Sequence, residues 1–301
     1  MEIESIKILI ASNNRPVTLK KTINSIIENK VPKNVSVAII IIENGVKSKI
    51  EDFISKLKMQ DRLSAKYCYI QQAGKSKALN YALKNFCDNK DFIMFTDDDT
   101  IVGKEWISGY LDAIKQHGQQ CFYGGGIKVP EYVSVSYPFL QKFLLPSQRG
   151  FDYTIEEKES NCLFIGPNWG AFYSHIYKCG FFDEKLGPGT HIPLGDETLL
   201  QEKLQNLGLK PYYIKNNYVT HNIQIKKIKP KDIIKKNYII GKRRVHCNIE
   251  VKPYYVCLFK ILINIIRIII HFFNIEKRFK YRFQLSYNLG ILVQKVKSSI
   301  S

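Results

Sequence analysis

We predict an α/β fold in which a mostly parallel, Rossmann-like sheet carries helices on both faces. Apolar runs at 6–11, 35–42 and 92–95, made of β-branched and other β-prone residues, have the length and composition of buried strands. Each run ends in a polar cluster and alternates with segments of helical spacing, which favours parallel strands joined by crossover helices. Hydrophobic residues make up 45% of the 301 residues, enough for a sizeable core.

The remaining elements continue this alternation. Pro16 suits the first turn of a helix. Residues 130–160 show no clear period and contain three prolines, which indicates an irregular binding loop. The other elements expected in chain order are helices at 16–29, 50–59, 73–89, 106–117 and 195–206 and strands at 67–71, 121–129 and 211–214.

Three consecutive carboxylates, Asp97, Asp98 and Asp99, follow the strand expected at 92–95. Like charges at one strand end repel and raise each other's pKa. A hard divalent cation such as Mg²⁺ or Mn²⁺ relieves this repulsion because it prefers oxygen ligands. Ligands of open α/β sheets bind at the carboxyl ends of strands. The sequence therefore predicts a metal site here; the alternative is a solvated acidic turn that caps the next helix.

Other polar residues at predicted element ends have both functional and structural readings. Gly74 with Lys75 and Lys77 opens a helix, where backbone N–H groups and lysines favour a phosphate. A P-loop is excluded because residue 69, where that motif needs glycine, is Tyr69. Asp196 and Glu197 can be helix caps, and a histidine after a strand, such as His221, is more often structural than a ligand.

Five short motifs occur in a fixed order, although each alone is weakly specific. They are Ser12-Asn13-Asn14-Arg15, Glu43-Asn44-Gly45, Gly74-Lys75-Ser76-Lys77-Ala78-Leu79-Asn80, Asp97-Asp98-Asp99, and Phe182-Asp183-Glu184-Lys185-Leu186-Gly187-Pro188-Gly189 leading to Gly195-Asp196-Glu197-Thr198. Over residues 5–222 their order and spacing resemble the family 2 glycosyltransferases of the GT-A fold.

The resemblance implies transfer of a sugar from a nucleotide diphosphate sugar, most often a UDP-sugar, with inversion and with Mn²⁺ or Mg²⁺. It implies that the metal is held by Asp97, Asp99 and His221. The family usually has Asp where this chain has Glu43, which would face the base. The residues implied to contact the nucleotide sugar are Ser12, Arg15, Glu43, Asn44, Gly74, Lys75, Lys77, Asn80, Asp97 and Asp98.

The catalytic base is left between two residues. Inverting transfer needs a carboxylate that takes the proton of the acceptor hydroxyl as it attacks. The family usually has Gly-Glu-Asp with Asp as base, whereas this chain has Gly195-Asp196-Glu197. Alignment favours Glu197 and residue type favours Asp196; we favour Glu197.

The positive charge is concentrated in the last part of the chain. Residues 223–301 contain 18 Lys and Arg against 3 acidic residues, so they carry +15 of the net +18. This asymmetry predicts a catalytic domain at 1–222 and a basic helical extension at 223–301 with an anionic partner.

Within this extension, residues 254–273 are apolar and as long as a membrane span of about 20 residues. However, Lys260, Asn264, Arg267 and His271 form one stripe on a helix, and a charge at mid-span costs about 2.5–3.5 kcal/mol. We therefore expect a helix lying in an anionic membrane surface. The alternatives are a helix buried against the catalytic domain with its stripe facing water, and a spanning or re-entrant segment.

Cysteine usage bears on location. Seven cysteines without a Cys-x-x-Cys pair, and no secretory segment, predict reduced thiols in the cytoplasm. With the basic extension, we expect an enzyme on the inner face of the membrane, acting on a lipid-linked glycan in bacterial surface polysaccharide synthesis. The alternatives are a nucleotidyltransferase of related fold and a nucleic-acid-binding protein. No nucleic acid is expected, because the aromatics are not interleaved with basic residues.

Overall fold

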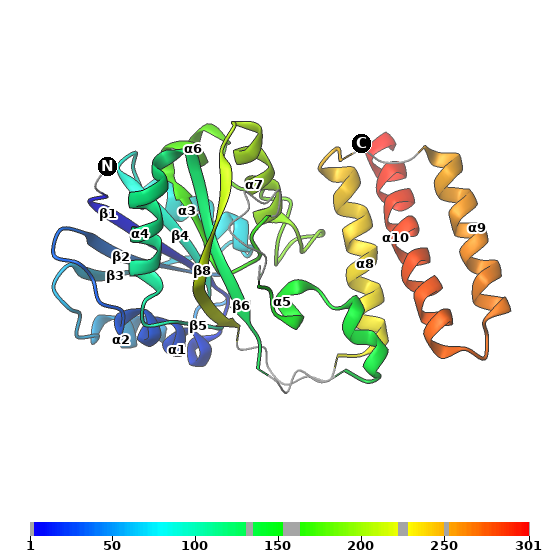
Figure 1. The fold of residues 1–301 in the computed structure, drawn as a ribbon, viewed down its shortest axis with the longest axis horizontal. Helices are drawn as coiled ribbons and strands as arrows, with labels where there is room; N and C mark the ends of the chain where they lie inside the picture. Colours follow the sequence, from blue (N-terminus) through cyan, green and yellow to red (C-terminus); the bar gives the residue numbers. More distant parts are fainter. Residues whose placement is uncertain (1–2, 131–134, 153–162, 222–227, 250–252, 301) are drawn as a thin grey trace. The chain divides into compact units, whose positions relative to one another are not determined.

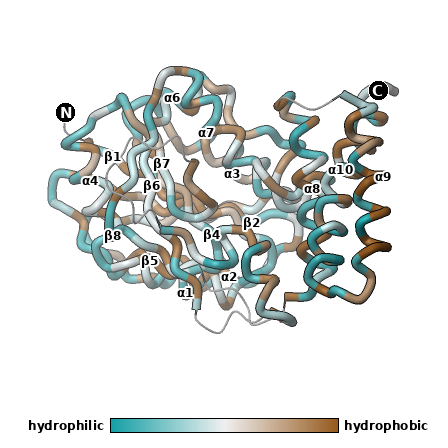
Figure 2. Tube along the Cα trace, turned by 45° about the vertical axis from the view of Figure 1, so that its right-hand side comes forward, coloured by the Kyte–Doolittle hydropathy of each residue, from teal (hydrophilic) through white to brown (hydrophobic). Residues whose placement is uncertain are grey.

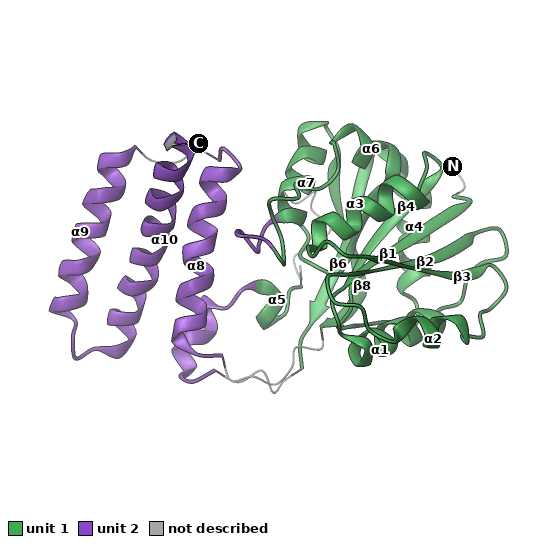
Figure 3. Ribbon diagram, turned by 180° about the vertical axis from the view of Figure 1, so that it is seen from behind, with its two compact units in different colours: residues 1–131, 146–189, 196–224 green, residues 132–145, 190–195, 225–301 purple. Residues whose placement is uncertain are grey.

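The computed structural model describes residues 3–130, 135–152, 163–221, 228–249 and 253–300. The chain divides into two compact units (Figure 3). The first contains residues 1–131, 146–189 and 196–224, and the second contains 132–145, 190–195 and 225–301. The second unit thus takes in two loops besides the expected extension. The functional division at residue 222 stays a prediction.

Eight strands in the described residues of the first unit form one sheet (Figure 1). The first four in spatial order are parallel, as predicted, whereas β7 runs antiparallel to both of its neighbours and β5 antiparallel to β8. In spatial order the strands are β3 (Leu63–Ile70), β2 (Ser36–Asn44), β1 (Ser5–Ser12), β4 (Asp91–Asp97), β7 (Trp169–Phe172), β6 (Cys121–Lys128), β8 (Lys210–His221) and β5 (Thr100–Val102).

Helices cover both faces of this sheet, which confirms the predicted α/β class. In β1, Ile8 and Ile10 belong to one core cluster and Leu9 to the other, as expected from the alternation of side chains along a strand. One face is covered by α1 (Pro16–Ile27), α2 (Ile50–Ser55) and α4 (Trp106–His117), and the other by α3 (Lys75–Phe86), α6 (Tyr173–Lys178) and α7 (Asp196–Asn206). A 3₁₀ turn, η1 (Gly118–Gln120), follows α4.

The last strand differs most from expectation. The sequence predicts a strand that ends at residue 214, but β8 continues to His221. Its pairing with β6 is irregular between Gly124 and Gly126, and Asn216 has a φ of +63°. The irregularity is a β-bulge that accommodates the polar residues after Ile214, so that regular pairing resumes beyond them. The three-residue β5, which the sequence did not predict, pairs Thr100 with His221.

The second unit is helical, as predicted for the extension. It contains α8 (Pro230–His246), α9 (Tyr254–Ile270) and α10 (Ile275–Ile300), with α10 between the other two (Figure 1). A Cβ atom on Gly241 would lie 2.2 Å from the carbonyl oxygen of Tyr287, and one on Gly290 would lie 2.0 Å from that of Tyr238. Only glycine permits so close a contact between α8 and α10.

The loop expected at 130–160 contains two short helices where it is described. The 3₁₀ helix η2 (Pro138–Phe143) belongs to the second unit, where Leu140 is buried with Ile233 and Phe279, and α5 (Pro146–Arg149) belongs to the first. The rest of the expected loop, at 131–134 and 153–162, lies outside the described residues.

Helix α9 turns its polar stripe toward α10 and its apolar side outward. Asn264 is 4% exposed, whereas Ile269 is 68% exposed. The ring of Tyr281 stacks on His271 and lies under the guanidinium of Arg267. Figure 2 shows the hydrophobic colour along α9. Within the stripe, Asn264 is buried, Lys260 and His271 are half-buried and Arg267 is exposed, so the alternative in which the whole stripe faces water does not hold. No helix in the described ranges is long and apolar enough to cross a membrane.

Candidate active site

The acidic cluster lies at the carboxyl edge of the sheet. Asp97 is the last residue of β4, and Asp98 and Asp99 form the turn that leads into β5. A cavity of about 210 Å³ opens beside them. Its lining residues are Ala11, Ser12, Asn13, Arg15, Asn44, Gly74, Lys75, Asp97, Asp98, Asp99, Pro188, Gly189 and His221.

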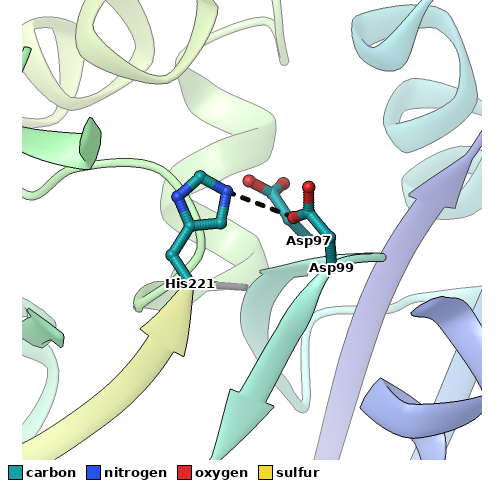
Figure 4. Close-up of side chains that lie close together, drawn as sticks. All are labelled: Asp97, Asp99 and His221. Carbon is teal, nitrogen blue, oxygen red and sulfur yellow. Dashed lines mark ion pairs between the residues drawn. The ribbon is translucent and has the colours of Figure 1, made fainter. Parts of the chain in front are cut away.

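Asp97, Asp99 and His221 form a potential metal site. One ligand atom from each residue lies within 4.8 Å of the other two, and Figure 4 shows the imidazole turned toward both carboxylates. The Nε2 atom of His221 is 3.2 Å from Oδ1 of Asp99, and its Nδ1 is 3.0 Å from the carbonyl oxygen of Ser147. A carbonyl on the second ring nitrogen is the usual way to orient a metal-binding histidine. This donor set therefore fits a divalent cation.

The ion pair between Asp99 and His221 shifts both pKa values. Burial lowers the pKa of His221, but the hydrogen bond and charge of Asp99 outweigh it and raise that pKa to about 8. Burial raises the pKa of Asp99, but His221, Arg15 and Lys75 outweigh it, so the net shift is downward. Without a cation, a protonated imidazole thus balances the carboxylate.

Ser12 and Arg15 hold the acidic turn. The Ser12 hydroxyl donates to Oδ2 of Asp98 at 2.7 Å, and Nη1 of Arg15 donates to Asp98 at 3.3 Å and to Asp99 at 2.9 Å. Burial raises the pKa of Asp98 to about 6, against the opposing effects of Ser12 and Arg15. These contacts fix Asp98 in the lining of the cavity.

Lys75 connects the metal carboxylates to the predicted base. Its Nζ donates to Asp97 and to Glu197, both at 2.5 Å. Burial lowers the pKa of Lys75, but the two carboxylates outweigh it and raise that pKa well above the usual value. Burial raises the pKa of Glu197 to about 7 although Lys75 lowers it. One ammonium therefore links Glu197 to the residue that ends β4.

Asp196, the other candidate base, packs against a loop. Its side chain is buried, and its Oδ2 lies 3.5 Å from the hydroxyl of Ser76. Gly187 has a φ of +91°, and a Cβ atom there would lie 2.6 Å from the same oxygen. Burial raises the pKa of Asp196. Neither Asp196 nor Glu197 is among the described residues that line the cavity, but Glu197 contacts Lys75, which is.

Glu43 and Asn44 end β2 beside the acidic turn. The side chain of Glu43 is 0% exposed; its Oε2 accepts from the Tyr67 hydroxyl at 2.7 Å and from the N–H of Ser48 at 3.0 Å. Its Oε1 has no hydrogen-bond partner among the described residues. Asn44 donates to the carbonyl of Ser12 and accepts from the N–H of Gly74, so it ties three loops together.

The motif at residues 74–80 divides between the cavity and the core. Gly74 and Lys75 line the cavity, and the N–H of Lys75 donates to the carbonyl of Pro188 at 3.0 Å. Asn80 lies outside the lining, where its amide exchanges hydrogen bonds with the backbone of Phe182. Lys77 is half-buried and also outside the lining.

The sequence analysis did not assign a role to several residues at the site. Asn13, Pro188 and Gly189 line the cavity, Ser147 orients His221, and Tyr67 bonds Glu43. The first three stand inside the motifs quoted above, so their position was the available signal. No pattern in the sequence connects Ser147 to His221.

Two larger cavities lie elsewhere. One of about 490 Å³ lies between α4 and β8, and one of about 760 Å³ lies among α8, α9 and α10. Neither contains the acidic triplet. The chemistry of the side chains, rather than cavity size, identifies the candidate active site.

The sheet and the acidic cluster at its carboxyl edge define an α/β protein of the GT-A class. The chain belongs to glycosyl transferase family 2, whose sequence model matches residues 7–180. It is therefore a glycosyltransferase, as the motifs predicted. No curated protein sequence matches the chain.

Solved structures share the fold at low sequence identity. S. aureus TarS 1-349 in complex with UDP-GlcNAc is 12% identical with a TM-score of 0.56, over 99% of this chain and 92% of that one. GalNAc-T7 with UDP, GalNAc and Mn²⁺ is 13% identical with a TM-score of 0.57, over 98% and 58%. Mannosyltransferase PcManGT from Pyrobaculum calidifontis with GDP-Man and Mn²⁺ is 12% identical with a TM-score of 0.56, over 98% and 74%. The chain spans 41% of the length of a longer TarS chain.

Proposed function

We propose that the chain is an inverting, metal-dependent glycosyltransferase that moves a sugar from a UDP-sugar to a lipid-linked glycan. The observation that carries this proposal is the cluster of Asp97, Asp99 and His221 beside the pair of Lys75 and Glu197. Similar structures hold UDP-GlcNAc, or UDP with Mn²⁺, which supports the choice of donor. GDP-Man in another is the reason to test guanosine donors as well.

The donor is bound from the ends of β2 and β4, the strands on either side of β1. The free Oε1 of Glu43 accepts a hydrogen bond from the base, while Tyr67 and Ser48 hold the other carboxylate oxygen. Asp97, Asp99 and His221 would hold Mn²⁺ or Mg²⁺, which as a Lewis acid would stabilise charge on the departing diphosphate. Lys75 and the backbone at Gly74 add positive potential on the same side.

Glu197 is the base in this proposal. A general base works best with a pKa near the working pH, and burial brings that of Glu197 to about 7. Its contact with Lys75, which also bonds Asp97, keeps Glu197 near the proposed metal site. By alignment Glu197 stands at the position of the family's Asp base, with a side chain one methylene longer.

The helical unit supports the choice of acceptor. The net charge of +15 on residues 223–301 and the exposed apolar side of α9 suit an anionic membrane surface, where a lipid-linked glycan is presented. We place the enzyme on the cytoplasmic face of the membrane, in the synthesis of a bacterial surface polysaccharide.

Nucleotide release tests the proposal. The purified chain is incubated with UDP-, GDP-, dTDP- and CMP-sugars, with Mn²⁺, Mg²⁺ or a chelator. We expect UDP release from one UDP-sugar, only with metal, and inverted anomeric configuration in the product by NMR. Release from a GDP-sugar would overturn the choice of donor. Pyrophosphate release from a nucleoside triphosphate would instead indicate a nucleotidyltransferase.

A further inference from the structure

The helical unit contains a cavity of about 760 Å³ that is separate from the acidic cluster. It is lined by residues of α9 and α10, with Asn237 from α8. The volume falls within the range of small-molecule sites. Its lining combines aromatic rings with the two cations of the α9 stripe, Lys260 and Arg267.

One buried polar atom in this cavity lacks a partner. Asn264 lines the cavity and is 4% exposed, and its Oδ1 has no hydrogen-bond partner among the described residues. The two other buried asparagines of the cavity are satisfied, because Asn237 donates to the carbonyl of Phe283 and Asn288 to that of Gln284. A buried carbonyl oxygen without a hydrogen-bond partner destabilises the fold. Asn264 therefore calls for a hydroxyl or N–H donor from a ligand.

The cations stand on either side of this acceptor. Lys260, Asn264 and Arg267 occupy positions i, i+4 and i+7 of one helix, so they share a face. The guanidinium of Arg267 lies 5.4 Å from the centre of the Tyr281 ring, which leaves its N–H groups free to bind an anion. The three side chains thus offer two cations and one acceptor, which suits a phosphate ester that also carries a hydroxyl group.

The side of α9 that faces away from α10 is apolar, and this apolar surface reaches the edge of the cavity. The outward side of α9 and the following turn is exposed, and Phe259 belongs both to it and to the cavity lining. Its residues are Tyr255, Leu258, Phe259, Leu262, Ile265, Ile266, Ile269, Ile270 and Phe273. A contiguous apolar surface of this kind beside a cationic cavity fits an amphiphile better than a free anion.

We infer that the cavity between α9 and α10 binds the headgroup of an anionic phospholipid that bears hydroxyl groups, such as phosphatidylglycerol. Lys260 and Arg267 hold the phosphate, a headgroup hydroxyl donates to Oδ1 of Asn264, and the acyl chains lie along the outward side of α9. This deepens the membrane association proposed above by naming the lipid and its site. It is independent of the donor chemistry.

Vesicle flotation of the full chain tests the inference. We expect binding to phosphatidylcholine vesicles to rise at least about 10-fold when phosphatidylglycerol is included. The charge-neutral variant Asn264→Leu should lose most of that increase, and so should Lys260→Gln/Arg267→Gln. The matched control Lys231→Gln/Lys235→Gln removes two exposed cations of α8 and should keep most of it. Equal losses in both double variants, with Asn264→Leu unaffected, would show diffuse attraction and overturn the site.

A second measurement uses the unmodified chain and does not depend on the folding of variants. Native mass spectrometry should detect one dihexanoyl phosphatidylglycerol bound per chain, in preference to dihexanoyl phosphatidylcholine. Inorganic phosphate should not displace it at equal concentration. Displacement by phosphate would indicate a free-anion site and contradict the choice of a lipid. Nucleotide release without vesicles should be unchanged in Asn264→Leu, so failure here is distinguishable from failure of the proposed transferase.

Discussion

The acidic edge of the sheet and the helix α9 treat their polar groups in opposite ways. At the sheet edge the carboxylates, one buried and two half-buried, are paired: Asp97 with Lys75, Asp98 with Ser12, and Asp99 with Arg15 and His221. Helix α9 instead turns its polar stripe inward and leaves its apolar side exposed. In the proposed function, the first arrangement exchanges its internal partners for a cation and a diphosphate. The second has apolar surface that water does not satisfy.

The largest effect is expected at the proposed base, Glu197. A change there should alter the rate of the chemical step but not the binding of the nucleotide. Glu197→Gln should lower kcat by about 10²–10⁴-fold, because proton removal from the acceptor is lost, while UDP binding stays within a few-fold. Asp196→Asn is the matched control and should lower kcat less. For both variants, steady-state kinetics measures kcat and a UDP titration measures nucleotide binding. A larger kcat loss in Asp196→Asn would assign the base to Asp196.

The next effect concerns the second strand end, where Glu43 has one free oxygen. Glu43→Gln should weaken the binding of uridine, UMP and UDP alike, by about 10–100-fold. The reason is that a hydrogen bond to a charged group contributes about 1.5–3 kcal/mol. Tyr67→Phe keeps the free Oε1 of Glu43 and should weaken the binding of these ligands less. Calorimetry measures the affinity of each ligand. Loss confined to UDP would mean that Glu43 acts on the phosphates rather than on the base.

A smaller effect is expected on the outward side of α9. Ile269→Glu should reduce vesicle binding by about 10-fold, because it removes one buried aliphatic side chain from the lipid contact. Val17→Glu, at a similarly exposed apolar residue of α1, should leave vesicle binding unchanged. Surface changes of this kind alter the free energy of unfolding by about 0.5 kcal/mol or less. Urea unfolding of both variants checks that they are folded. Equal vesicle binding by Ile269→Glu and the unmodified chain would argue against lipid contact.

The smallest effect distinguishes a ligand-binding asparagine from a structural one. Asn264→Leu should stabilise the lipid-free chain by about 1 kcal/mol, because the unpaired Oδ1 disappears. Asn288→Leu should not stabilise it, since Asn288 donates to the carbonyl of Gln284. Urea unfolding of both variants measures the difference. Destabilisation of both would mean that Asn264 has a structural partner.

The same two regions show what could be predicted from the sequence. The first four strands and the acidic strand end were predicted because β-branched runs and like charges leave local signals. Residues 97, 99 and 221 come together through β5, a three-residue strand that pairs with β8 beyond a bulge at Asn216. Neither feature has a local signal: Lys215 and Asn216 look like a strand end, and β5 is too short to show a period.

In the helical unit, the stripe on α9 was predicted from its spacing, but the direction it faces was not. Orientation depends on packing against α10, whose Tyr281 ring stacks on His271 and lies under Arg267 across the turn between the two helices. The close contact of α8 and α10 likewise depends on Gly241 meeting a backbone 46 residues away, a pairing that only the fold defines.

Mn²⁺ binding, followed by electron paramagnetic resonance as UDP is added, tests the central claim most directly. The account predicts that the chain binds a single Mn²⁺ with UDP and that Asp99→Asn weakens this by more than about 100-fold, since even outer partners of a metal contribute about 10–100-fold. Asp112→Asn, the same change on α4 away from the acidic cluster, should bind as the unmodified chain does. Equal Mn²⁺ binding by Asp99→Asn and Asp112→Asn would contradict a metal site at the end of β4.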